Sequence, residues 1–534
     1  MLNRCLSKYL SVIIFLFWTS SHPINASSSD GSNNFLGSNS KELGELSIDI
    51  DGDGKVDALT DGLLLLRYMF GLSGNSLTSG VISDTATYTS SNDLISRISA
   101  LGNTIDIDSN GDVDALTDGL MILRYLFGID GSALINNVIG ANADRTSTND
   151  IENHLQQLAD IPSNESRQPN IILIISDDHG LDSSAQYSLN NDPPKTPNLD
   201  QLAFNGIVFD NAWATPVCTT TRSTMITGKY GVNSGVLNVG DIIPADSVIL
   251  QRHIKDDPST SNYVSAVIGK WHLGGSSPQA SHPNDMGVDY YAGNLRGSIN
   301  DYESWPLTIN GQTNQATTYH TTKTTDLAID WIDAQTEPWF LWLAYVAPHS
   351  PFHLPPPSLH TQNLSGSEED IATNPRPYYL AAIEAMDTEI GRLLSSLSQE
   401  ERDNTTILFV GDNGTPRQVA DRSIYANGSK GNLTEGGLAV PMIASGASVS
   451  RQNVREDALI SSTDFFATIT NIAGSSQTSV EDSKSFKHLL TSNSSNHRDY
   501  LYSDFSGNNV SGWAVRNNFF KLISTDNGLS LIHI

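Results

Sequence analysis

Two apolar segments of the chain each end in a pair of neighbouring oxygen-bearing side chains. Asp177 and Asp178 follow the run N-I-I-L-I-I-S, and Asp412 and Asn413 follow the run T-I-L-F-V-G. Such runs are typical of buried parallel strands, whose carboxyl ends carry ligand-binding residues. Either pair alone would be interpreted as turn or helix-cap residues. Together they predict one site for a hard divalent cation, because carboxylate and amide oxygens are the ligands such a cation prefers.

A cysteine stands in an unusually polar segment, P-V-C-T-T-T-R-S-T-M-I-T-G-K-Y-G, where it is Cys218. Arg222 and Lys229 bring positive charge, and the pattern indicates the start of a helix. Both features lower the pKa of a thiol and bind anions. A lone cysteine is usually a buried, inert residue, but the hydroxyl-rich flank argues against that interpretation. We therefore expect a reactive position beside an anion.

One acidic unit occurs twice within residues 46–160, at an offset of 57 residues. The copies read I-D-I-D-G-D-G-K-V-D-A-L-T-D-G and I-D-I-D-S-N-G-D-V-D-A-L-T-D-G. Alternate acidic side chains before a glycine are the pattern of an EF-hand calcium loop. The expected ligands are Asp49, Asp51, Asp53, Asp57 and Asp61 in the first loop and Asp106, Asp108, Asn110, Asp114 and Asp118 in the second.

The last ligand of each loop departs from the usual spacing. Thr60 and Thr117 occupy the twelfth position, so we expect Asp61 and Asp118 to close the shell one residue later. The apolar segments 63–70 and 120–127 are predicted to be helices that pack together as the core of a small all-α domain.

Composition places these sites in an acidic, globular chain. The 534 residues include 30 Lys and Arg against 59 Asp and Glu, for a net charge of −29. This charge argues against a nucleic-acid or anionic-membrane binder, so a polyanionic substrate would need a local basic cluster. The length predicts two to four domains.

The amino terminus, residues 1–26, has the pattern of a signal peptide. Arg4 and Lys8 precede an apolar run over 12–18, and a small-residue cleavage site ends at Ala26. The run is shorter than the roughly 20 residues that span a bilayer, and no later stretch is long enough either. We therefore expect export to the periplasm, the cell surface or the medium, with no membrane span.

Residues 161–169 have the composition of a linker, and 170–528 form the large domain. Helical patterns such as Y-Y-L-A-A-I-E-A-M-D-T-E-I alternate with apolar strands, which predicts an α/β fold with a mostly parallel sheet flanked by helices. We expect the carboxyl-terminal subdomain to be incomplete and make no prediction of fold from Leu529 onward.

Six motifs of the large domain occur in an order that resembles a known family. They are D-D-H-G, C-T-T-T-R-S-T-M-I-T-G-K-Y-G, Y-V-S-A-V-I-G-K-W-H-L-G, A-P-H-S-P, G-D-N-G and K-G-N-L-T-E-G-G-L-A-V-P. In this order they resemble the formylglycine-dependent sulfatases of the alkaline phosphatase superfamily, over about 170–523. A late segment, W-A-V-R-N-N-F-F-K-L-I, resembles the start of that family's carboxyl-terminal sheet. The resemblance implies an alkaline-phosphatase-like fold and hydrolysis of sulfate monoesters.

The resemblance also implies a role for each motif residue. A Ca²⁺ ion would be held by Asp177, Asp178, Asp412 and Asn413 and touched by Cys218 after its oxidation to formylglycine by a formylglycine-generating enzyme. The hydrate of this aldehyde would supply the nucleophilic hydroxyl, stabilised by Arg222. The remaining residues would bind sulfate and move protons; they are Lys270, His272, His349 and Lys430.

Within that set, the family assigns His349, with Lys430 nearby, as general acid and His272 as base. His353, four residues beyond His349, is the alternative for the general acid. The substrate expected by analogy is a sulfated polysaccharide or oligosaccharide.

One departure leaves two alternatives open. The usual maturation motif has proline two residues after the cysteine, where this chain has Thr220. An unmodified Cys218 would leave a sulfated-glycan binding protein with little turnover. A phosphate or phosphonate ester hydrolase of the same superfamily is the second alternative.

The duplicated loops resemble the dockerin family, whose paired calcium loop–helix units attach exported carbohydrate-active enzymes to a scaffold. The resemblance implies two further Ca²⁺ ions and a cohesin-like or surface scaffold partner.

Overall fold

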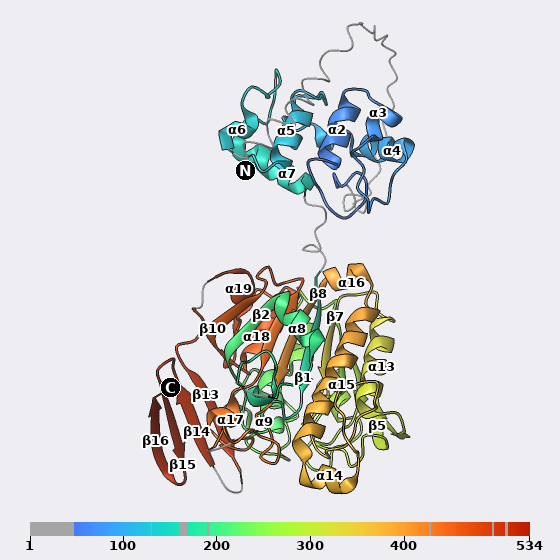
Figure 1. The fold of residues 1–534 in the computed structure, drawn as a ribbon. Helices are drawn as coiled ribbons and strands as arrows, with labels where there is room; N and C mark the ends of the chain where they lie inside the picture. Colours follow the sequence, from blue (N-terminus) through green and yellow to red (C-terminus); the bar gives the residue numbers. More distant parts are fainter. Residues whose placement is uncertain are drawn as a thin grey trace. The chain divides into compact units, whose positions relative to one another are not determined.

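The structure, a computed structural model, describes residues 47–129, 131–159, 168–189, 192–426, 429–493, 496–507 and 511–533. The predicted signal peptide, 1–26, and most of the predicted linker lie outside these ranges. The chain divides into two compact units, Met1–Ile161 and Pro162–Ile534 (Figure 1). Among the helices in the described ranges, none combines the length and apolarity that a bilayer crossing needs.

The small unit consists of two copies of a loop followed by three helices. The first copy contains α2 (Asp61–Met69), α3 (Asn75–Thr78) and α4 (Ser91–Leu101), and the second contains α5 (Asp118–Leu126), α6 (Gly131–Ile135) and α7 (Thr148–Ala159). A short 3₁₀ helix, Gly102–Ile105, joins the copies. The predicted helices 63–70 and 120–127 are therefore α2 and α5, each of which begins two residues early at a buried aspartate.

Helices α2 and α5 pack against each other, as predicted, at a matched pair of glycines. A Cβ atom on Gly62 would lie 3.0 Å from Leu123, and one on Gly119 would lie 2.8 Å from Met69. The absence of side chains at these positions brings the helices into close contact, because a bulkier residue would force them apart. Leu64, Leu65, Met121 and Ile122 are among the residues that form the main core of the unit on the other side of the pair.

The large unit contains a ten-stranded sheet. In spatial order its strands are β10 (Val454–Ser461), β2 (Gly206–Trp213), β9 (Met442–Gly446), β8 (Thr405–Gly411), β1 (Asn170–Ser176), β7 (Trp339–Ala344), β3 (Val264–Gly269), β4 (Tyr290–Gly293), β5 (Trp305–Ile309) and β6 (Gln312–Ala316). The five strands from β8 to β4 are all parallel.

The sheet is therefore mostly parallel, as predicted, and is mixed because it also contains antiparallel strands. Strand β9 runs antiparallel between β2 and β8, and β5 and β6 form an antiparallel hairpin at the edge. The hairpin turns through Asn310 and Gly311, both at positive φ, which is the conformation of a two-residue type I′ turn.

Side chains of β1 alternate between two apolar cores, one on each face of the sheet. Ile172 and Ile174 pack in a core that includes side chains of α8 (Pro197–Phe204), α13 (His320–Ile332) and α15 (Pro375–Ser396). Ile171, Leu173 and Ile175 pack in the opposite core with α9 (Cys218–Thr227), α11 (Leu250–Asp256) and α18 (Asp464–Ala473). Burial on both faces explains the continuous apolar run that predicts this strand.

Shorter helices complete the unit: α10 (Gly231–Ser234), α12 (His282–Met286), α14 (Glu368–Thr373), α16 (Gln399–Asp403), α17 (Glu435–Leu438) and α19 (Lys487–Thr491), with the 3₁₀ turn Leu181–Ser183. A two-stranded ribbon is formed by β11 (Ser479–Val480) and β12 (Ser483–Lys484).

A second, four-stranded antiparallel sheet ends the described chain. Its strands are β13 (Leu501–Ser506), β14 (Ser511–Arg516), β15 (Phe520–Thr525) and β16 (Gly528–His533). The segment W-A-V-R-N-N-F-F-K-L-I forms most of β14 and β15, so it lies in this sheet but does not start it, because the sheet begins one strand earlier at β13. Strand β16 covers the region beyond Leu529 for which the sequence offers no expectation.

The carboxylate of Glu435 joins this sheet to the main one. It accepts a hydrogen bond from Trp213 Nε1 at 3.0 Å, and it pairs with Lys521 Nζ at 3.0 Å and Arg516 Nη1 at 3.5 Å. Lys521 is buried beside the Trp213 ring, and burial lowers its pKa to about 8 despite the opposing effect of Glu435. Glu435 therefore neutralises two cations at the join between the sheets.

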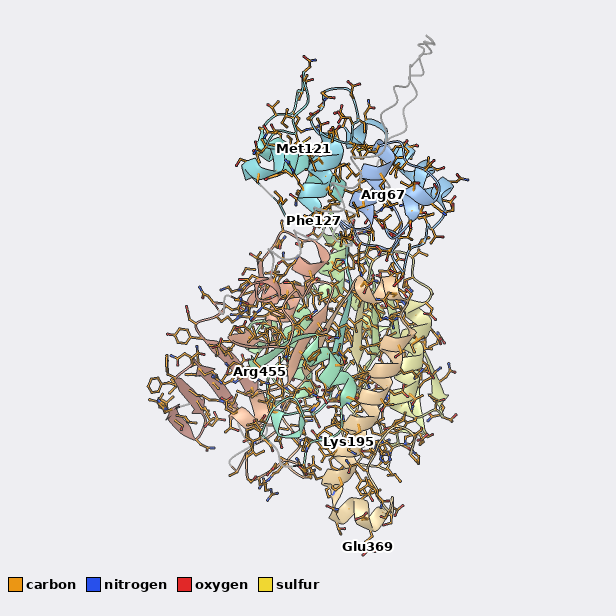
Figure 2. All side chains as sticks on the ribbon, turned by 45° about the horizontal axis from the view of Figure 1, so that its top comes forward. Arg67, Met121, Phe127, Lys195, Glu369 and Arg455 are labelled. Atoms are coloured by element: carbon orange, nitrogen blue, oxygen red, sulfur yellow. The ribbon has the colours of Figure 1, made fainter. Side chains whose placement is uncertain are left out.

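We expect Glu435→Gln to lower the free energy of unfolding by about 1–3 kcal/mol, because the buried Lys521 and Arg516 would lose the carboxylate that pairs with both. Urea unfolding measures this. The control is Asp210→Asn, which removes the exposed partner of Arg455 on the surface of the large unit (Figure 2) and should cost less than about 1 kcal/mol. Equal effects of the two substitutions would contradict this role for Glu435.

Candidate active site

The two predicted oxygen pairs meet at the carboxyl ends of β1 and β8. These strands pair in parallel with Ser176 opposite Gly411, so that each pair follows at the same edge of the sheet. The Asp178 backbone N–H donates to Asp412 Oδ1 at 2.9 Å, and Asn413 Nδ2 donates to Asp178 Oδ1 at 2.8 Å. Asp178 adopts a left-handed backbone, φ 64°, which turns the chain sharply after the strand.

Two oxygens of this cluster have no hydrogen-bond partner among the described residues. They are Asp177 Oδ1 and Asn413 Oδ1, and both residues are fully buried. A buried polar oxygen without a partner is costly, so a native protein gives it one. The four predicted metal ligands Asp177, Asp178, Asp412 and Asn413 offer oxygen atoms, and the two orphaned oxygens belong to this set. The residues therefore fit a hard divalent cation such as Ca²⁺.

Cys218 begins helix α9 beside the metal cluster. Its Sγ and one carboxylate oxygen each of Asp177 and Asp412 lie within 4.8 Å of one another. Val217 before it is extended, and the helix runs from Cys218 to Thr227, with Arg222 one turn later on the same side. The buried cysteine therefore lies at a helix amino terminus, where negative charge is favoured.

Three basic side chains contact the cluster, and all of them are predicted site residues. Arg222 Nη2 pairs with Asp412 Oδ2 at 2.8 Å and its Nη1 donates to the Lys270 carbonyl oxygen at 2.9 Å. The Lys270 ammonium contacts Asp177, and the Lys430 ammonium contacts Asp178. Arg222 and Lys270 are fully buried, and Lys430 is 21% exposed, so Lys430 faces the opening of the site.

With every group ionised, the formal charges of the site balance. Three carboxylates, on Asp177, Asp178 and Asp412, oppose the three cations. A divalent cation would leave an excess of about two positive charges in a low-dielectric pocket, which suits an anionic ester and the charge that grows on it during hydrolysis. The site is thus a local positive region in a chain whose net charge is −29.

His272 adjoins Cys218. Its Nδ1 lies 3.3 Å from Cys218 Sγ, and the Thr219 hydroxyl lies 3.1 Å from its Nε2. Burial, followed by the charges of Lys270 and Arg222, holds the pKa of His272 well below its usual value. The imidazole is therefore neutral near pH 7 and able to accept a proton, as its predicted role requires.

His349 lies on the other side of the cluster, with Nε2 3.6 Å from Asp178 Oδ2. Its Nδ1 is 2.7 Å from the Ser350 carbonyl oxygen, which only accepts, so Nδ1 carries a proton and Nε2 faces the site. Burial lowers the pKa of His349, and Asp178 opposes this. A bound anion would add to the effect of Asp178 and favour the protonated form that a general acid needs.

The alternative residue, His353, does not face the cluster. Its ring stacks on Tyr302 with centroids 3.9 Å apart, and its Nε2 lies 2.9 Å from the Tyr319 hydroxyl. Of the two candidates, His349 is therefore the one that the fold places beside the carboxylates.

Several supporting residues were not predicted. The Tyr302 hydroxyl donates to the His349 carbonyl oxygen at 2.7 Å, and the Tyr379 hydroxyl donates to the Asp178 carbonyl oxygen at 2.7 Å. A Cβ on Gly297 would lie 2.1 Å from His272 Nε2, so only glycine fits there. These residues are far from the motifs along the chain, and no pattern in the sequence distinguishes them.

The predicted calcium loops of the small unit bring most of their acidic residues together. Ligand oxygens of Asp49, Asp51 and Asp53 lie within 4.8 Å of one another, as do those of Asp106, Asp108 and Asp118. Asp57 and Asp114 lie at the edge of their loops, where each Oδ1 accepts from the backbone of the next turn. Asn110 Oδ1 accepts from the Asp112 N–H at 2.8 Å.

Asp61 and Asp118 tie the two ends of each loop together. Asp61 accepts from Ile50 N at 2.6 Å and Asp57 N at 3.0 Å, and Asp118 repeats both bonds with Ile107 and Asp114. Burial raises the pKa of Asp61 to about 6. Each carboxylate therefore organises its loop in addition to any contact with a cation.

The fold and the site define an α/β protein with a buried cluster of carboxylates and basic side chains at the carboxyl edge of its sheet. The profile of the sulfatase family matches residues 169–475, which is more than half of the chain. The chain belongs to the sulfatase family.

Curated relatives agree with this assignment. Arylsulfatase J of Mus musculus is 28% identical over 329 residues, which cover 57% of this chain and 52% of that protein. N-acetylgalactosamine-6-sulfatase of Homo sapiens is 30% identical over 318 residues, which cover 52% of this chain and 56% of that protein. The chain thus spans about half the length of these relatives.

Solved structures share the fold. The crystal structure of Ps i-CgsB in complex with k-i-k-neocarrahexaose is 27% identical, with a TM-score of 0.56 over 68% of this chain and 86% of that one. The phosphonate monoester hydrolase of Agrobacterium radiobacter has the same fold at 20% identity, with a TM-score of 0.51 over 68% of this chain and 89% of that one.

Proposed function

We propose that this protein hydrolyses sulfate monoesters, with a formylglycine derived from Cys218 as nucleophile and a Ca²⁺ ion bound beside it. The observation that carries the proposal is the position of Cys218: its Sγ lies with the Asp177 and Asp412 carboxylates in one cluster and 3.3 Å from His272. The metal would be held by Asp177, Asp178, Asp412 and Asn413. Bound there, it would offset negative charge on the ester oxygens.

The other site residues would position the reacting groups, bind the sulfate and transfer protons. Arg222 fixes Asp412 and the Lys270 carbonyl, and so places two site groups relative to helix α9. Lys270 and Lys430 offer ammonium groups to the sulfate oxygens from opposite sides of the carboxylates. His272 accepts a proton near position 218. His349 Nε2, with Lys430 beside Asp178, donates a proton to the leaving oxygen.

The substrate we propose is a sulfated carbohydrate. Support comes from the relatives, since one is named N-acetylgalactosamine-6-sulfatase and one solved structure holds neocarrahexaose. The signal-like sequence over 1–26 and the duplicated loops support an exported enzyme attached to a surface or to a cohesin-like scaffold. No nucleic-acid partner is proposed for so acidic a chain.

The reaction is tested by comparing two esters of the same phenol. We expect the matured protein to release sulfate from an aryl sulfate at least about 100 times faster than phosphate from the aryl phosphate, with activity lost on calcium removal. Preference for the phosphate or a phosphonate ester would instead support the alternative hydrolase.

Thr220 favours a second candidate, a sulfated-glycan binding protein that lacks turnover because Cys218 stays a thiol. We expect Thr220→Pro to raise the fraction of chains with an aldehyde at position 218 several-fold. Thr220 is the third residue of α9, where the backbone N–H has no partner within the helix and proline is tolerated. Peptide mass spectrometry measures the fraction. An unchanged fraction would contradict a limiting effect of Thr220.

We also propose that each duplicated loop binds one Ca²⁺ ion, for about three ions per chain with the sulfatase site. Asp51→Asn and Asp108→Asn should each remove about one ion, because both residues are fully buried in a group of three acidic ligands. Metal analysis after dialysis measures the count. Lys55→Gln, in the same loop but outside the acidic group, is the control and should keep all three; loss of no ion from either Asp variant would contradict the proposal.

A further inference from the structure

Most arginine side chains in the described ranges are paired. Some bond to carboxylates, as Arg376 does with Asp192 and Arg498 does with Asp464, and others bond to backbone carbonyls, as Arg97 does with Asp49. Within the described part of the chain, three arginines have a guanidinium group without a hydrogen-bond or ion-pair partner: Arg296, Arg417 and Arg422. All three are exposed. The chain has 59 acidic residues, so a shortage of carboxylates does not explain their lack of partners.

Arg296 stands at the edge of the candidate site. Its segment follows β4 and runs beside the His272 segment, with Trp271 N bonded to the Asn294 carbonyl and His272 N bonded to the Leu295 carbonyl, each at 3.1 Å. The next residue, Gly297, touches the His272 ring, since a Cβ there would lie 2.1 Å from Nε2. Leu295 packs into the core below, and Arg296 is the exposed residue between the two.

Arg417 and Arg422 lie in the segment 415–426, which follows the proposed metal ligands Asp412 and Asn413. The base of this segment is held at the site, because Lys430 N bonds to the Thr415 carbonyl at 3.1 Å and Gly431 N bonds to the Pro216 carbonyl at 2.9 Å.

The middle of segment 415–426 is fixed beside the His349 segment. Val419 packs in one cluster with Phe352 and Tyr379, and the Arg376 guanidinium donates to its carbonyl oxygen at 2.6 Å. The two arginines thus flank a rigid point of the segment next to the general-acid side of the site.

From this placement we propose that Arg296, Arg417 and Arg422 form a cationic rim that binds an anionic group of the substrate other than the ester being cleaved. This inference rests on the proposed function and narrows it to carbohydrates that carry two or more negative charges. The planar guanidinium binds sulfate and carboxylate with two parallel hydrogen bonds, and these groups are free to do so. The rim is needed because the remainder of the molecule repels a polyanion.

The test uses the full chain with Arg296→Gln, Arg417→Gln and Arg422→Gln, singly and together. Arg402→Gln is the matched control, because Arg402 is exposed in α16, just before β8 begins, and so lies at the edge of the sheet opposite the site (Figure 1). The substrates are an aryl monosulfate, a monosulfated disaccharide, a disulfated disaccharide and a monosulfated disaccharide that contains a uronic acid.

We expect the triple variant to lose about 10- to 100-fold more kcat/KM on a doubly charged disaccharide than on the aryl monosulfate, chiefly through KM. Loss on the disulfated sugar alone identifies a second sulfate as the ligand, and loss on the uronic acid sugar identifies a carboxylate. Equal losses on all substrates, or no loss, would overturn the proposal. If the triple variant fails to fold, the losses of kcat/KM on the doubly charged disaccharides and on the aryl monosulfate are compared for the single variants instead.

Calorimetric binding separates this inference from the proposed function. The Cys218→Ala chain should bind the disulfated disaccharide. Adding the three arginine substitutions to that chain should raise the Kd by about 10- to 100-fold, the same factor as the loss of kcat/KM. If the wild-type chain hydrolyses no ester but shows this arginine-dependent binding, the proposed function fails and the rim stands.

Discussion

Cys218→Ala is expected to reduce sulfate release by about 10⁴-fold or more, because it removes the only group in the cluster that can become the nucleophile. The fold should survive, since the thiol makes one hydrogen-bonding contact, at 3.3 Å to His272, and alanine keeps the Cβ atom and a high helix propensity. Initial rates on an aryl sulfate, at equal calcium and equal protein, measure the effect.

The matched control is Thr219→Ser. Thr219 adjoins Cys218 and its hydroxyl contacts His272, so this variant perturbs the same turn but keeps the hydroxyl and the thiol. It should lose less than about tenfold. If Cys218→Ala kept more than a tenth of wild-type activity, a nucleophile at this position would be ruled out.

The second large effect concerns His349. We expect His349→Gln to lower turnover of a sugar sulfate by about 10²–10⁴-fold and turnover of a nitrophenyl-type aryl sulfate by less than about tenfold. A sugar alkoxide is a poor leaving group that needs a proton, whereas a nitrophenolate departs without one. The ratio of the two kcat values therefore reports proton donation.

His353→Gln is the control for this ratio. His353 belongs to the same segment but stacks on Tyr302 and faces away from Asp178. It should change both substrates by a similar, small factor. If His353→Gln and not His349→Gln changed the ratio, the assignment of the general acid would be reversed.

The parts of the fold that follow local rules could be predicted from the sequence. β1 and β8 are buried on both faces, so they appear as unbroken apolar runs, and α2 and α5 follow from apolar periodicity after an acidic loop. The antiparallel insertion of β9 could not be predicted, because it depends on contacts between Ile443 and both Val208 and Phe409, which are far apart along the chain.

The residues of the site can also be separated into those that local sequence patterns predict and those that they do not. The paired oxygens could be predicted from strand ends, because the carboxyl ends of parallel strands share an edge. Lys270, His272 and Lys430 lie in loops without periodicity, so only their motifs in family order identified them. Tyr302 and Gly297 were missed because their roles arise from contacts with His349 and His272 across the fold.

The most direct test measures the rate of sulfate release against the fraction of chains that carry an aldehyde at position 218. The fraction is varied by co-expressing the formylglycine-generating enzyme to different extents and is read from the tryptic peptide. Our account predicts a rate proportional to that fraction and no rate at zero aldehyde. Sulfate release by chains that are entirely thiol at Cys218, or no release by fully converted chains with calcium bound, would contradict it.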